Sequence, residues 1–193
     1  MEEVRKIALA YYANLSDGQK EKVKSLFKEM AADGDEKVTL SEYENNFKKL
    51  GLSCNIPKNS SLFKEIFQER KTSFFMELDK NGDGSLDFEE FITLFYLLKT
   101  GRLLFCTGNG CQVFLGGIFF TCPQCFDNPR KTNFTLCLDC FSSKNYSHKH
   151  PLLVDNYAFL LSKVQPKSAI ATTFEVLTFG ADVISVASLC AIM

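Results

Sequence analysis

The chain has 193 residues, of which 46% are hydrophobic, a fraction typical of a folded protein with one medium domain or two small ones. Its 22 lysines and arginines nearly balance 23 aspartates and glutamates, and the net charge of −1 excludes a large basic field that would attract nucleic acid. The first 18 residues contain two early glutamates and a short apolar patch, which does not fit a secretory signal. We expect a cytoplasmic or nuclear protein whose eight cysteines serve metal binding better than disulfides.

Three composition regimes divide the chain: a charged region with helical periodicity to about residue 99, a cysteine-rich region over 103–150, and an apolar tail over 166–193. A short helix is expected over 1–15. Ser16 and Gln19 have the spacing of a capping box, and apolar residues then recur every three to four positions. Further helices are expected at about 42–50, 60–78 and 88–98. A generic helical bundle would explain this periodicity over 16–100, but not the acidic loop within each helix pair.

The second acidic loop, DKNGDGSLDFEE at 79–90, has oxygen-bearing residues at the alternating positions of a twelve-residue calcium loop. Gly84 stands where the chain must turn sharply, and Glu90 stands where a carboxylate closes the coordination shell. An acidic solvated turn would have to match these positions by accident. We expect one Ca²⁺ here, with the ligands Asp79, Asn81, Asp83, Ser85 (through its carbonyl), Asp87 and Glu90.

The first acidic loop is less regular. Pairing Leu40 with Leu86 as equivalent apolar residues places this loop at 33–44, with Lys37 at the fifth position and Val38 at the sixth. An ammonium group at a ligand position and a β-branched residue at the turn both disfavour calcium. We expect a weak or empty loop that supports its neighbour; its oxygen-bearing residues are Asp33, Asp35, Thr39, Ser41 and Glu44.

Residues 16–99 thus resemble an EF-hand pair in which one loop has degenerated. Calcium is expected to shift the angle between the helices and to expose an apolar groove. With a single working site, calcium buffering remains an alternative to switching.

In the cysteine-rich region, three close cysteine pairs precede two histidines, and four such ligand pairs suit two tetrahedral Zn²⁺ sites. The segments GIFFTC and NFTLC alternate as short strands do, and LDCFSS can begin a short helix. Disulfides or scattered thiols would leave the paired histidines unexplained.

The order CPQC, CLDC and HKH resembles the ZZ-type zinc finger over 103–151. In that family the ligand pairs interleave in a cross-brace. The resemblance implies one zinc on Cys106, Cys111, Cys137 and Cys140, and a second on Cys122, Cys125, His148 and His150. The first pair departs from the family because four residues, rather than two, separate its cysteines. A RING-type ubiquitin ligase also has a cross-brace, but its ligand order does not end in two histidines.

The chain ends in CAIM, which fits a prenylation box and predicts a farnesyl group on Cys190. In the preceding residues polar side chains recur every three to four positions, leaving an apolar helix face that can lie in a bilayer surface. A membrane-spanning helix is a second interpretation, opposed by Glu175 and Asp182. In a third, the tail packs into the core.

The expected fold is mainly α: a helix-loop-helix pair, a small zinc-stabilised α+β cross-brace finger, and an apolar C-terminal helix. Both histidines are expected to be zinc ligands and no phosphate-binding glycine loop is present, so we expect no enzyme and no small-molecule substrate. This arrangement resembles a group of small plant calcium-binding proteins.

We therefore expect an adaptor for calcium signalling that is attached to a cytosolic membrane face through its tail and binds an unknown protein partner. The alternative is a soluble zinc-stabilised calcium buffer or structural protein. A ubiquitin-ligase-like protein is a lesser alternative.

Overall fold

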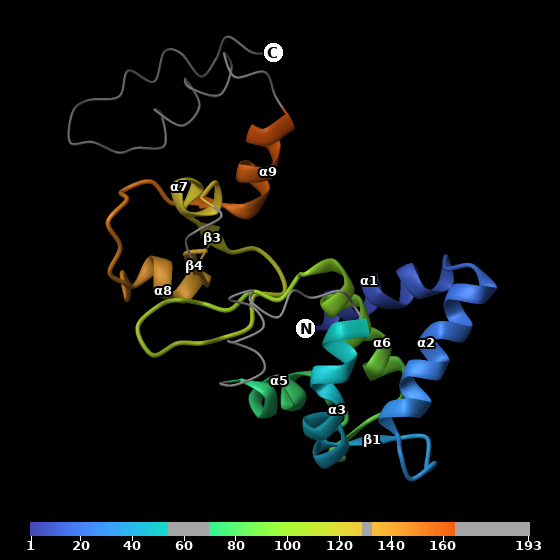
Figure 1. The fold of residues 1–193 in the computed structure, drawn as a ribbon. Helices are drawn as coiled ribbons and strands as arrows, with labels where there is room; N and C mark the ends of the chain where they lie inside the picture. Colours follow the sequence, from blue (N-terminus) through green and yellow to red (C-terminus); the bar gives the residue numbers. More distant parts are fainter. Residues whose placement is uncertain (54–69, 129–132, 165–193) are drawn as a thin grey trace, which may run out of the picture.

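A computed structural model describes residues 1–53, 70–128 and 133–164, which are mainly helical. Figure 1 shows the larger helices gathered in one half of the molecule and the cysteine-rich region forming the other. The helices of the first half are α1 (Glu2–Ala13), α2 (Asp17–Met30), α3 (Leu40–Ser53), α5 (Lys71–Leu78) and α6 (Phe88–Thr100). Among the described residues, no helix is long and apolar enough to cross a membrane. The predicted tail, with Cys190, lies outside them.

The two acidic loops are joined by a two-stranded antiparallel sheet. Strand β1 (Val38–Thr39) lies in the first loop and pairs with β2 (Ser85–Leu86) in the second. Helices α2 and α3 flank the first loop, and α5 and α6 flank the second, as the sequence predicts. Helix α2 begins at the predicted capping box, where the Ser16 amide donates to Gln19 Oε1 at 2.9 Å. These helix starts fix the chain direction on both sides of each loop.

A single hydrophobic core joins the five helices. Helix α6 is buried on most of its faces, because Phe91, Leu94 and Leu97 contact the other loop-flanking helices while α1 covers it with Val4 and Ala8. Burial of each large apolar side chain contributes about 1.5–3 kcal/mol. The N-terminal helix is therefore an integral part of this core.

The cysteine-rich half contains a three-stranded antiparallel sheet. Strand β3 (Phe120–Thr121) lies between β4 (Thr135–Leu136) and β5 (Val154–Asp155). Two short helices follow the first two strands, α7 (Pro123–Phe126) and α8 (Leu138–Ser142). Strands β3 and β4 and helix α8 confirm the sequence prediction. Strand β5 and helix α9 (Asn156–Val164) extend this half beyond residue 151, where the finger was expected to end.

Candidate metal centres

The second loop is held by hydrogen bonds between its predicted ligands and its own backbone. Asp79 accepts from the amides of Gly82 and Gly84 at 2.7 and 2.9 Å, and Gly84 has the left-handed conformation of the sharp turn (φ +81°). Glu90 accepts from the amides of Lys80 and Asp87 at 2.7 and 2.9 Å. These bonds tie the two ends of the loop together.

The side chains of this loop fit a hard cation. Asp79 and Glu90 are only 8% and 4% exposed, and buried carboxylates are costly unless a cation offsets their charge. The predicted ligands are all oxygens, which Ca²⁺ prefers, and they come from one twelve-residue segment. The chemistry of the donor set therefore agrees with one calcium ion at 79–90.

A lysine of the first loop reaches into the second. Lys37 Nζ donates to Asp83 Oδ2 at 2.7 Å, while the amide and hydroxyl of Ser85 donate to Asp83 Oδ1. The Lys37 ammonium and the Ser85 donors hold the pKa of Asp83 below its usual value, so this carboxylate stays charged. A predicted calcium ligand is thus already paired with a cation from the neighbouring loop.

The predicted register of the first loop is wrong. Val38, and not Leu40, pairs with Leu86, so the loop spans residues 31–42 rather than 33–44. Leu40 instead begins α3. Lys37 therefore stands at the seventh position, where only its carbonyl faces the metal position, and Glu36 takes the turn with φ +61°. The two original reasons for an empty loop do not hold.

The hydrogen bonds of the first loop repeat those of the second. Glu42 Oε1 accepts from the Ala32 amide at 2.7 Å, as Glu90 Oε1 does from Lys80, and Glu42 Oε2 accepts from Thr39 at 2.9 Å. Burial acts to raise the pKa of Glu42, but the bonds from Thr39 and Ala32 outweigh it and lower that pKa. Glu42 is therefore the counterpart of Glu90. The sequence analysis missed Glu42 and placed Glu44 in this role.

The residues predicted at the ninth and twelfth positions lie elsewhere. Ser41 is exposed on α3, and Glu44 accepts from Thr72 Oγ1 at 2.9 Å and pairs with Lys71 at 3.4 Å. In the observed register the side chains with oxygens at the ligand positions of the first loop are Asp33, Asp35, Thr39 and Glu42, and Ala31 takes the first position. The equal spacing from Val38 to Glu42 and from Leu86 to Glu90 was the available signal.

Restoring the missing carboxylate tests this register. We expect Ala31→Asp to add a second calcium site, because it supplies the only side-chain ligand that the first loop lacks. Isothermal titration should show the stoichiometry rise from one to two. Ser41→Asp is the matched control, since residue 41 is exposed and lies outside the ligand positions of the observed register, although the predicted register made it a ligand. If neither variant bound a second calcium ion, the result would contradict the register assigned to the first loop.

The first cysteine group combines two cysteines from the start of the cysteine-rich half with two from the beginning of α8. The Sγ atoms of Cys106, Cys111, Cys137 and Cys140 all lie within 4.8 Å of one another. Cys111 and Cys137 are 3.7 Å apart, which matches the edge of about 3.8 Å in a tetrahedron with Zn–S bonds of about 2.3 Å and excludes a disulfide at about 2.05 Å. This group can hold a zinc ion.

Backbone amides surround this group. Cys106 Sγ accepts from the amides of Gly108 and Cys137 at 3.4 and 3.2 Å, and such bonds stabilise metal-bound thiolates. Without a metal, burial and the neighbouring thiols raise the pKa of Cys140. Burial raises the pKa of Cys106 in the same way, and a bound cation would remove the protons of such buried thiols.

The unusual spacing of the first pair is accommodated by a glycine. An added Cβ on Gly108 would lie 2.5 Å from Cys140 Sγ and 2.9 Å from Cys140 Cβ. Only glycine fits this close approach of the backbone to a ligand. The four-residue segment between Cys106 and Cys111 therefore wraps around the cysteine group, and this long spacing still leaves the four Sγ atoms within 4.8 Å of one another.

The second group brings together Cys122, Cys125, His148 and His150, again within 4.8 Å. Cys122 Sγ lies 3.3 Å from His150 Nδ1, and Cys125 Sγ lies 3.5 Å from His148 Nε2. The mixed edge of a tetrahedral zinc site is about 3.6 Å. Phe134 stacks on the His148 ring at 3.8 Å and orients it. The interleaved ligand grouping implied by the resemblance is thus present in space, and it can hold two zinc ions.

The two halves meet at an aromatic cluster next to the first cysteine group. Phe74 of α5 lies 6.0 Å from Phe105 and 5.7 Å from Phe114, measured between ring centroids. Arg70 extends over the Phe105 ring and donates to the carbonyl of Gln112 at 2.9 Å. Phe105 precedes a predicted zinc ligand and Phe74 lies on the helix that enters the calcium loop. The aromatic cluster therefore joins the helix that enters the calcium loop to the segment that leads into the first cysteine group.

Comparison with protein families supports the helical half of this account. The EF hand domain model matches residues 72–98, which include most of α5, the second loop and most of α6. No curated protein and no solved structure matches the chain. The chain thus contains an EF-hand at 72–98, as expected for calcium binding, and two Cys/His groups compatible with zinc.

Proposed function

We propose that this protein is a non-enzymatic, calcium-responsive adaptor that combines an EF-hand pair with a ZZ-type zinc finger and acts at a cytosolic membrane face. The observation that carries the proposal is the shared core around Phe74, Phe105 and Phe114. A pure buffer requires no such contact, whereas an adaptor uses it to pass a change in α5 to the finger. The partner is a protein that binds the finger or the EF-hand surface.

Helix α9 supports the membrane part of the proposal. Tyr157, Leu160, Leu161 and Val164 are 63%, 58%, 40% and 75% exposed, and their spacing places them on one face. The opposite side is anchored, because Phe159 packs on Phe126 at 4.8 Å. An exposed apolar face that leads directly into an apolar tail ending in CAIM fits contact with a bilayer surface.

The mass of the protein purified from eukaryotic cells tests the attachment. We expect a farnesyl group on Cys190 and loss of residues 191–193, and the lipidated chain should sediment with vesicles. Cys190→Ser, which cannot be lipidated, is the control and should sediment less. An unmodified C-terminus would remove the lipid anchor from the proposal.

The competing function is a soluble calcium buffer stabilised by zinc. The observation in its favour is that α1 covers α6, so that apolar surface of the EF-hand half is already occupied by the chain itself. Calcium-dependent binding to an apolar resin separates the two functions. An adaptor gains affinity for the resin when calcium is added, and a buffer does not.

A further inference from the structure

The N-terminal helix α1 lies against the entrance of the calcium loop. Arg5 Nη2 donates to the carbonyls of Glu77 and Leu78 at 2.9 and 3.1 Å. These are the last two residues of α5, and the next residue, Asp79, is the first predicted calcium ligand. The Arg5 side chain is only 14% exposed, and its bond to the Leu78 carbonyl forms in a partly buried environment where hydrogen bonds are strengthened.

Arg5 binds at the C-terminal end of α5, which is the end of a helix that most favours a cation. The last carbonyls of a helix lack partners within it and carry negative partial charge, and a cation near them contributes up to about 2 kcal/mol in partly buried sites. Arg5 comes from an element more than 70 residues away in the sequence. Val4 and Ala8 fix α1 on α6. The Arg5 guanidinium on α1 therefore holds the end of α5 at a set distance from α6.

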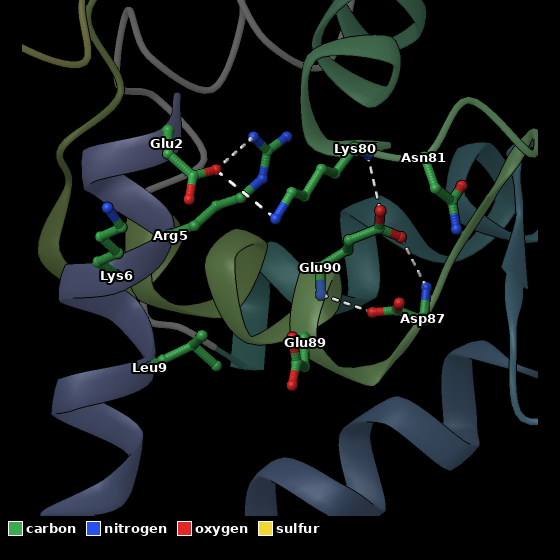
Figure 2. Close-up of a pocket in the computed structure, with 9 residues that line it drawn as sticks. All are labelled: Glu2, Arg5, Lys6, Leu9, Lys80, Asn81, Asp87, Glu89 and Glu90. Carbon is green, nitrogen blue, oxygen red and sulfur yellow. Dashed lines mark hydrogen bonds and ion pairs between the residues drawn. The ribbon is translucent and has the colours of Figure 1, made fainter.

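Glu2 offsets the charge that Arg5 brings to the loop. Its carboxylate lies 3.9 Å from Arg5 Nη1 and 3.7 Å from Lys80 Nζ, and the Lys80 amide donates to Glu90. These side chains line a cavity of about 260 Å³ between α1 and the loop. Figure 2 shows how they face one another across it. Arg5 and Lys80, the two cations beside the calcium position, are thus both paired with Glu2, which lies on the same turn of α1 as Arg5.

We propose that Arg5 is a positioning residue for calcium, so that the docking of α1 sets the calcium affinity of the EF-hand. A loop whose entrance is already held loses less conformational freedom when it binds an ion. Calcium binding and α1 docking are then linked, and calcium must stabilise the docked helix as much as the docked helix favours calcium. This inference rests on calcium binding by residues 79–90.

The direction in which calcium affinity changes when Arg5 loses its charge distinguishes a positioning role from simple electrostatic repulsion. If Arg5 acted only as a nearby cation, Arg5→Met would strengthen calcium binding by removing repulsion. Positioning predicts the opposite, a loss of about tenfold in affinity. Lys6→Met removes the same charge from an exposed side chain beside the same cavity and is expected not to weaken binding. Arg5→Lys keeps a donor at the helix end and should recover part of the loss.

Isothermal calcium titration of the zinc-loaded full chain gives these affinities, and thermal unfolding without calcium reports stability separately. In the wild type, calcium should increase the hydrogen-exchange protection of residues 2–13, and Arg5→Met should abolish that increase. Calcium binding by Arg5→Met as tight as in the wild type would overturn the inference. A wild type that binds no calcium would instead overturn the function on which it rests.

Discussion

Glu90→Gln is expected to lower the calcium affinity of the protein by at least about 100-fold, which corresponds to about 2.7 kcal/mol. The twelfth-position carboxylate supplies two oxygens and a full negative charge to the ion, and the amide retains one neutral oxygen. Glu90 also lies in the first turn of α6, so its bond to the ion connects the loop to the exiting helix. Calcium titration by calorimetry measures the change.

The neighbouring residue provides a matched control. Glu89 is exposed on the first turn of α6, and Glu89→Gln removes the same charge without removing a ligand. We expect that variant to bind calcium within a few-fold of the wild type, as is usual for exposed charges. Equal affinities for the Glu89 and Glu90 variants would mean that residues 79–90 do not hold the ion as assigned.

Removal of zinc is expected to unfold the finger and to destabilise the EF-hand half as well. Structural zinc contributes about 10–16 kcal/mol to the folding of small zinc domains. The finger has a short sheet and few buried apolar residues, whereas Phe105 and Phe114 belong to the core of the helices. Losing the zinc that fixes Cys106 would release Phe105 from this core.

Hydrogen exchange and thermal unfolding test that expectation, with a zinc-selective chelator or with Cys140→Ser. Protection should fall in the finger and in α5, and the melting temperature should fall for the whole chain. Cys54→Ser, at a cysteine that is not a predicted ligand, should leave both unchanged. Melting of the finger alone, with α5 unaffected, would contradict the coupling of the two halves.

The sequence predicted most of the helical half because its signals are local. The capping box at Ser16 and the amphipathic spacing in α2 and α6 depend on residues within one or two turns. The close cysteine pairs were also predictable as metal ligands, since short spacing brings two thiols together by chain geometry. The family resemblance added only the interleaving of the pairs.

Other features depend on contacts that a single sequence does not encode locally. The register of the first loop is decided by the pairing of Val38 with Leu86 of the second loop; the sequence analysis chose Leu40 for that pairing, although the spacing from Val38 to Glu42 equals that from Leu86 to Glu90. Strand β5 is two residues long and is stabilised by β3, so no periodicity reveals it. In the sequence Arg5 cannot be distinguished from an ordinary surface cation, because its carbonyl partners on α5 are more than 70 residues away along the chain.

Native mass spectrometry of the full chain, purified without chelators and then titrated with calcium, tests the central claim most directly. The account predicts two zinc ions in the purified protein and one further calcium ion after titration, with all six finger cysteines reduced. A chain that carries no zinc, or whose finger cysteines are joined as disulfides, would contradict the metal-centred account. So would a zinc-loaded chain that takes up no calcium.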